Sequence, residues 1–141
     1  MEHVINPFSG SDMVKLGMSS EEIQSIMGVE PERILKSQFD TELSDFYDEM
    51  IVYYDDSKTS YMIDFTEPGV VLFNGISIIG KPIAEVETMF RRLDDDIRYD
   101  IINGFVSLKY DIAVYSETMN SPVESVAVAK QGVFRCLLDK T

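Results

Sequence analysis

The chain has 141 residues, 25 acidic and 12 basic side chains, one histidine and one cysteine, and its net charge is −13. One cysteine excludes an internal disulfide, and the negative charge argues against binding to nucleic acid or to anionic membranes, because both attract basic surfaces. The length indicates a single domain over residues 1–141, large enough to bury a hydrophobic core. An acidic surface of this kind keeps a small protein soluble or steers it toward a positively charged partner.

The N-terminal segment does not have the pattern of a signal peptide. It lacks a positive region followed by an apolar stretch, and no apolar run in the chain approaches the length of a membrane span. Pro7, Gly10 and several small polar residues predict a loose lead-in over residues 1–12, which would contain His3. We therefore expect a soluble cytoplasmic protein.

A capping box predicts the start of the first helix. In the segment Ser19-Ser-Glu-Glu22 the first hydroxyl can accept a bond from the backbone near Glu22, whose carboxylate can reach back. Ile23 and Ile26 then fall on one helical face. These signals predict a helix over residues 19–27, followed by a second short helix that begins at Pro31 and turns Ile34 and Leu35 inward.

Strands are predicted where β-branched and aromatic residues alternate with polar ones. Residues 61–65 alternate most clearly, so Ile63 and Phe65 should face the helices and Met62 and Asp64 should face away. The other expected strands cover residues 50–55, 70–73, 105–110, 112–116, 123–129 and 133–138, and another helix is expected over residues 82–92. The expected core contains Ile23, Ile26, Phe65, Val86, Phe90, Ile112, Val114 and Val126.

Two stretches of the chain, at about residues 14–75 and 78–138, align as weak copies of one unit. Gly17 aligns with Gly80 and Gly69 with Gly132, in both cases 63 residues apart. Between them, the strand Ile51–Asp55 is matched with Ile112–Ser116. Two helix-then-hairpin repeats in tandem imply an α+β fold, with one largely antiparallel sheet and helices on one face. Such a sheet is suited to docking more than to catalysis.

Few residues are candidates for enzyme or metal chemistry. The single histidine lies in the expected lead-in, Cys136 has no candidate base, and the nucleophile-elbow, Walker and dinucleotide-binding motifs do not occur. The run that starts at Asp94 lacks the ligands and the glycine of a calcium-binding loop. The sequence therefore predicts a protein that is not an enzyme, with no catalytic residue, no cofactor and no metal.

The segment Leu16-Gly-Met-Ser-Ser-Glu-Glu-Ile-Gln-Ser-Ile-Met-Gly28, followed by two strands, resembles the helix-then-strands unit of the β-lactamase-inhibitor-protein-like superfamily. It is also similar to the signature of the small lipoproteins of the β-barrel assembly machinery. The resemblance implies two copies side by side in one antiparallel sheet, and a protein that binds another protein. The second copy lacks the closing glycine after Phe90, and the chain has neither the lipidation signal nor the disulfide pairs of those proteins.

Small acidic proteins of this class also resemble the immunity proteins of bacterial toxin systems. That resemblance implies an inhibitor of a basic toxin domain, with a nuclease as the expected toxin, because many such toxins are nucleases. A non-enzymatic scaffold or assembly protein of a bacterial or phage complex is the alternative. Partner-binding residues are expected on the open sheet face and in two hairpin turns at one end of that face; an acidic run is the alternative location of the docking surface. They are Tyr54, Asp55, Asp56, Met62, Asp64, Tyr115, Glu117, Asp94, Asp95 and Asp96, with Val52, Ala113 and Ser125 beside them on the sheet.

Overall fold

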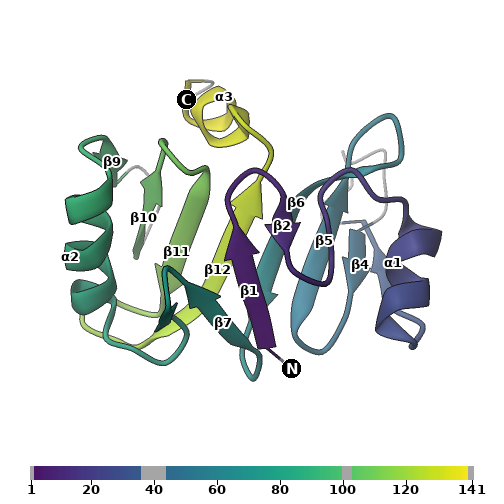
Figure 1. Ribbon diagram of the computed structural model, residues 1–141, viewed down its shortest axis with the longest axis horizontal. Coiled ribbons are helices and arrows are strands. Elements are labelled where there is room, and N and C mark those ends of the chain that lie inside the picture. Colours follow the sequence, from purple (N-terminus) through teal and green to yellow (C-terminus); the bar gives the residue numbers. More distant parts are fainter. Residues whose placement is uncertain (1, 36–43, 100–102, 140–141) are drawn as a thin grey trace.

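The computed structural model describes residues 2–35, 44–99 and 103–139. In these ranges the chain belongs to the predicted α+β class, with mostly antiparallel sheets and three short helices (Figure 1). The elements are β1 (Glu2–Asn6), β2 (Gly10–Ser11), α1 (Ser20–Met27), β3 (Glu32–Ile34), β4 (Ser44–Phe46), β5 (Met50–Tyr54), β6 (Ser60–Thr66), β7 (Val70–Phe73), β8 (Ile76–Ser77), α2 (Ile83–Leu93), β9 (Ile97–Arg98), β10 (Gly104–Ser107), β11 (Ile112–Ser116), β12 (Val123–Ala129) and α3 (Val133–Asp139).

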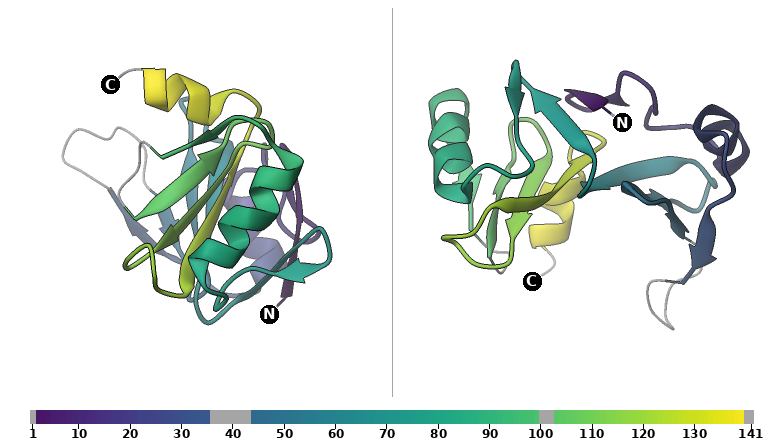
Figure 2. Two further views of the ribbon diagram at one scale, coloured as in Figure 1. Left: turned by 90° about the vertical axis from the view of Figure 1, so that its left-hand side faces the viewer. Right: turned by 90° about the horizontal axis from the view of Figure 1, so that it is seen from below.

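Eight strands form the main sheet, in the order β3-β4-β5-β6-β12-β11-β10-β9, and all its pairings are antiparallel. A four-stranded sheet of order β2-β1-β7-β8 lies in front of it, between α1 and α2 (Figure 1). We call the side of the main sheet that these elements cover the core face. Helix α3 packs on the other side, which we call the open face (Figure 2).

Helix α1 begins and ends as the sequence predicts. Ser19 Oγ accepts from the backbone nitrogen of Glu22 at 3.2 Å, Glu22 Oε1 accepts from the nitrogen of Ser19 at 3.2 Å, and Gly28 ends the helix with φ 72°. Ile23 is fully buried, but the prediction for Ile26 is wrong, because 39% of it is exposed. An eight-residue helix at one end of the sheet buries only a narrow stripe, and Ile26 lies outside it.

The hydrophobic core lies between the main sheet and the elements on its core face. Apart from Ile26, the expected core residues are confirmed, since each of them is at most 1% exposed. Aromatic rings fill the space next to α2: Phe90 stacks on Phe73 with ring centres 5.2 Å apart and meets the edge of Phe105 at 5.5 Å. One continuous apolar cluster contains residues from Ile5 to Val128 and therefore joins both halves of the chain.

Three segments differ from their predicted structure, and each difference has a long-range cause. The expected lead-in contains β1, which pairs with β7 in parallel, and His3 is fully buried. The expected helix after Pro31 is strand β3, which pairs with β4. The expected strand over residues 133–138 is helix α3, whose first turn is held by Asp111: its carboxylate accepts from the nitrogens of Gly132 and Phe134 at 2.9 and 3.1 Å.

The buried His3 makes the stability of the fold dependent on pH. Burial lowers the pKa of His3 below its usual 6.5, although Glu49, 3.5 Å away, opposes the shift. The folded state therefore holds a neutral imidazole, while the unfolded chain takes up a proton as the pH falls through 6.5. We therefore expect His3 to lower the free energy of unfolding as the pH falls below about 7.5, by at most about 1.4 kcal/mol per pH unit.

Urea unfolding of the wild type and of His3→Phe at about pH 7.5 and about pH 5.5 measures this contribution, because the usual pKa of a histidine side chain lies between these two values. Both proteins share all carboxylates, so the difference between their pH dependences isolates His3. The wild type should lose more stability than the variant, in which the ring contact of His3 with Phe65 can persist. Parallel pH curves would contradict the prediction.

The two halves of the chain repeat the same backbone contacts. Gly17 N donates to Ser60 O at 2.8 Å, and Gly80 N donates to Val123 O at 2.9 Å. The two donors are 63 residues apart in the sequence, and so are the two acceptors. Isolated bridges join Ser19 to Thr59 and Pro82 to Pro122, again with this offset. The main sheet accordingly consists of two four-stranded meanders that meet at β6 and β12.

The repeat also explains why β5 faces the wrong way in the sequence prediction. Met50 pairs with Phe65 as Ile112 pairs with Val128, so β5 and β11 correspond with an offset of 62 and not 61. Ile112 therefore matches Met50, not Ile51. Because strand side chains alternate, this one-residue slip exchanges the two faces. Val52, expected on the open face, is fully buried in the core.

Candidate protein-docking site

A shallow hollow of about 510 Å³ lies on the open face, across the junction of β6, β12 and β11. Small residues form its floor, because Ala113 pairs with Ala127 and Ala127 pairs with Asp64. Polar residues and one ring surround this floor: Asp64, Thr66, Glu67, Tyr115, Glu124 and Ser125. Of the described residues that line it, three are carboxylates and none is basic, so the hollow is suited to a positively charged group.

A β-bulge brings Glu124 to this hollow. Tyr115 pairs with Ser125, but the next residue, Ser116, pairs with Val123, so β12 contains one residue more than β11 at this point. Glu124 is that extra residue, and it lines the hollow together with its neighbour Ser125. The backbone nitrogen of Glu67 donates to Glu124 O at 3.2 Å, which holds the two acidic residues next to each other. Bulges commonly redirect a side chain in this way.

The structure brings together two of the residues that the sequence predicts for partner binding. Asp64 and Tyr115 both line the hollow, with Ala113 and Ser125 beside them as expected, and Tyr115 is 41% exposed. Met62 lies on the same face but packs against the apolar cluster under α3. Helix α3 covers one part of the open face (Figure 2). The hollow borders on this part, because Ala113 and Ala127 line the hollow and also pack against the cluster under α3.

Tyr54 does not belong to the open face. It packs against the main core, and its hydroxyl donates to Asp45 Oδ2 at 2.7 Å. Asp45 is 1% exposed and also accepts from Ser20 Oγ at 2.6 Å and from Arg33 Nε at 3.1 Å. Burial and the adjacent Asp45 carboxylate raise the pKa of Tyr54. The tyrosine is thus half-buried in a polar cluster beneath the N-terminus of α1, and it does not line the hollow.

The two hairpin turns lie at opposite ends of the sheet, contrary to the prediction that they share one end. β6 and β12 are antiparallel, so the turn before β6 and the turn before β12 point in opposite directions. Asp55 is used inside its turn, where its carboxylate accepts from the nitrogens of Ser57 and Thr59 at 2.9 and 3.3 Å. Asp56 and Glu117 are exposed in their separate turns.

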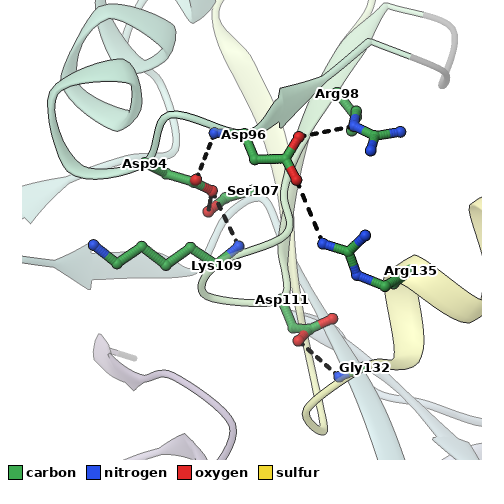
Figure 3. Close-up of polar contacts among 8 residues, drawn as sticks. All are labelled: Asp94, Asp96, Arg98, Ser107, Lys109, Asp111, Gly132 and Arg135. Atoms are coloured by element: carbon green, nitrogen blue, oxygen red, sulfur yellow. Dashed lines mark hydrogen bonds and ion pairs between the residues drawn. The ribbon is translucent and has the colours of Figure 1, made fainter.

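The acidic run after α2 stabilises the fold through two of its three members (Figure 3). Asp94 is 4% exposed and accepts from Ser107 Oγ at 2.6 Å and from the nitrogen of Lys109 at 3.1 Å. Asp96 forms ion pairs with Arg98 at 2.9 Å and with Arg135 of α3 at 3.4 Å, and the arginines lower its pKa. Asp95 is exposed. Asp94 and Asp96 thus connect the end of α2 with β10 and α3. Among the described contacts, Asp95 is the one carboxylate of the run that does not bond to another element.

Four residues of the hollow are absent from the sequence prediction: Thr66, Glu67, Glu124 and Ala127. Thr66 and Ala127 continue the alternation that places Asp64 and Ser125 on the open face, so the same period-two signal could have found them. Glu124 could not be found in this way, because the bulge interrupts the alternation directly before it. Glu67 follows the end of β6 and has no strand pattern to orient it.

Comparison of the chain with protein families, with curated proteins and with solved structures finds no match. Within residues 2–35, 44–99 and 103–139, no three histidine, cysteine or acidic side chains are grouped so that they could hold a metal ion. In the same ranges no helix combines the length and the apolar character that crossing a membrane requires.

Proposed function

We propose that this chain is an acidic protein-binding inhibitor of the immunity class, and that its open sheet face covers the basic cleft of a toxin domain, with a nuclease as the expected target. The acidic hollow is the observation that carries the proposal. It is concave, it lies on the part of the open face that α3 leaves uncovered, and an exposed tyrosine stands beside its carboxylates. Buried aromatic anchors surrounded by polar groups are typical of binding hot spots.

The distribution of charge supports a basic partner. Residues 1–75 contain 15 acidic and 4 basic side chains, and residues 76–141 contain 10 and 8, so the net charges are −11 and −2. The hollow lies where these halves meet, between β6 and β12. An uneven negative field of this kind accelerates association with a positively charged surface and orients the encounter.

Capture of a partner from the native host, followed by an assay of the captured protein, tests the proposal. Ser125→Trp fills the hollow and suits a strand, since large aromatic residues are favoured there. Asp56→Lys is the matched control, because it changes an exposed acidic residue in the β5–β6 turn. We expect wild type and Asp56→Lys to capture one basic protein in equal amounts and Ser125→Trp to capture none. One equivalent of wild type should block the activity of that protein, assayed first on DNA and RNA.

Other outcomes of this experiment contradict the proposal in distinguishable ways. Loss of capture by Asp56→Lys alone would place the docking site in the β5–β6 turn. Capture of a multi-protein assembly by Ser125→Trp and wild type alike would favour the scaffold function. Two exposed valines on the four-stranded sheet, Val4 and Val70, give that alternative a second surface, since they are 41% and 39% exposed on neighbouring strands.

A further inference from the structure

The centre of the open face lies on the axis that relates the two repeats. Residues of β6 correspond to residues of β12 with an offset of 63, and Asp64 pairs directly with its own counterpart, Ala127. A twofold pseudo-symmetry axis therefore passes between these two residues, perpendicular to the sheet. The hollow borders on this axis, because both residues line it.

The segments that follow β6 and β12 take different paths from equivalent starting points. After β12, Gly132 leads into α3, which packs on the open face through Phe134. After β6, the equivalent Gly69 leads into β7, which pairs with β1 on the core face. Among the described residues, α3 thus covers one of two equivalent areas of the open face, and its counterpart in the first half has no such cover (Figure 2).

The side chains of the two areas also differ: those next to α3 are apolar, and their counterparts in the first half are polar. In the second half, Ala129 belongs to the apolar cluster under α3, and Ala127 lies at the edge of that cluster, where it also forms part of the floor of the hollow. The counterparts of these alanines are Asp64 and Thr66, and the counterpart of Lys130 is Glu67. Where one half has small apolar residues and a base, the other has two carboxylates and a hydroxyl. Asp64, Thr66 and Glu67 form the β6 side of the hollow, and this side is therefore unsuited to an apolar helix and suited to a cation.

We propose that the hollow holds the side chain of an arginine that a protein partner carries on a loop or strand tip. This inference rests on the proposed function and specifies the partner chemistry of the same site. A guanidinium group can form two parallel hydrogen bonds to a carboxylate and can stack on an aromatic ring. Glu67 and Glu124 provide carboxylates at the hollow, and Tyr115 provides the ring. The alanine floor leaves room for the planar group, and the volume of about 510 Å³ lies within the range of sites that hold small molecules.

Titration with N-acetyl-arginine amide, followed by amide NMR shifts, tests this inference without knowledge of the partner. N-acetyl-citrulline amide is the matched control, because it has nearly the same shape and no charge. We expect saturable shifts confined to Ala113, Tyr115, Ser125 and Ala127 at a Kd of about 1–10 mM, as suits a ligand with few atoms. Added salt should weaken the binding, and the citrulline compound should produce no saturable shift.

The variant Glu67→Gln/Glu124→Gln distinguishes charge recognition from binding in a neutral hollow. Both side chains line the hollow without a structural side-chain bond among the described contacts, so the variant should fold as wild type does. We expect the Kd for the arginine compound to rise at least about tenfold, a loss of about 1.4 kcal/mol. Equal affinity of the variant, equal shifts with citrulline, or no saturable shift with arginine would each overturn the inference.

Failure of this inference can be told apart from failure of the proposed function. If Ser125→Trp abolishes capture of the partner while Glu67→Gln/Glu124→Gln captures it as wild type does, the hollow is the docking site but its occupant is not basic. If the arginine compound binds in the hollow while Ser125→Trp still captures the partner, the cation site is real and the partner docks elsewhere.

Discussion

Replacing Phe90 with alanine is expected to lower the free energy of unfolding by about 3–5 kcal/mol, the range for truncation of a large buried aromatic residue. Phe90 is 1% exposed and contacts the rings of Phe73 and Phe105, so the substitution leaves a cavity between α2 and both sheets. These three rings connect the helix to β7 and β10, and the neighbouring backbone cannot collapse into the space without moving two strands.

Urea unfolding measures this loss, and Ile26→Ala is the matched control. Both positions are apolar and helical, but Ile26 is 39% exposed, so its truncation should cost less than about 1 kcal/mol. A loss below about 1 kcal/mol for Phe90→Ala, or equal losses for the two variants, would show that Phe90 is not packed in the core between α2 and the sheets.

Replacing Asp45 with alanine is the second change with a large expected effect. Asp45 occupies a core position of β4, since it pairs with Val52 as Phe105 pairs with Val114 in the second half. Its removal leaves the Tyr54 hydroxyl and the Ser20 hydroxyl without their acceptor and separates Arg33 from its carboxylate. We expect a loss of about 3 kcal/mol, the lower end for breaking a buried ion pair, because Arg33 is 41% exposed.

Asp48→Ala provides the comparison for Asp45→Ala, because Asp48 is an exposed aspartate in the turn after β4. Its substitution should change the free energy of unfolding by no more than about 0.5 kcal/mol. The double variant Asp45→Ala/Tyr54→Phe should be little less stable than Asp45→Ala alone, since the hydrogen bond between the two residues is already lost. Additive losses in the double variant would indicate that the two residues act separately.

Local signals in the sequence predict the parts of the fold that local contacts determine. The capping box from Ser19 to Glu22 fixes the start of α1, and the alternation over residues 61–65 orients β6 correctly. The pairing of β1 with β7 joins residues more than 60 positions apart, and nothing in the N-terminal segment alone indicates it. Helix α3 likewise depends on Asp111, which lies more than 20 residues before it.

For the candidate site, the sequence predicts the residues that strand alternation controls and misses those that depend on register. Asp64 and Tyr115 are found because β6 and β11 are regular at these positions. Tyr54 is misplaced because a one-residue error in aligning β5 with β11 exchanges the faces of the strand. Glu124 is missed because a bulge, which pairing geometry determines, places it beside Ser125. Charge composition predicted an acidic surface but could not locate it.

The different paths taken after β6 and β12 also bear on stoichiometry. If both halves of the sheet face were equivalent, they would form two equal binding sites related by the axis between Asp64 and Ala127. Such a face could bind two copies of one partner. Because α3 occupies one of these areas, the described residues leave a single binding area on this face for a partner. A complex formed through the hollow should therefore contain one copy of each chain, and a light-scattering mass that corresponds to two partners per chain would contradict this.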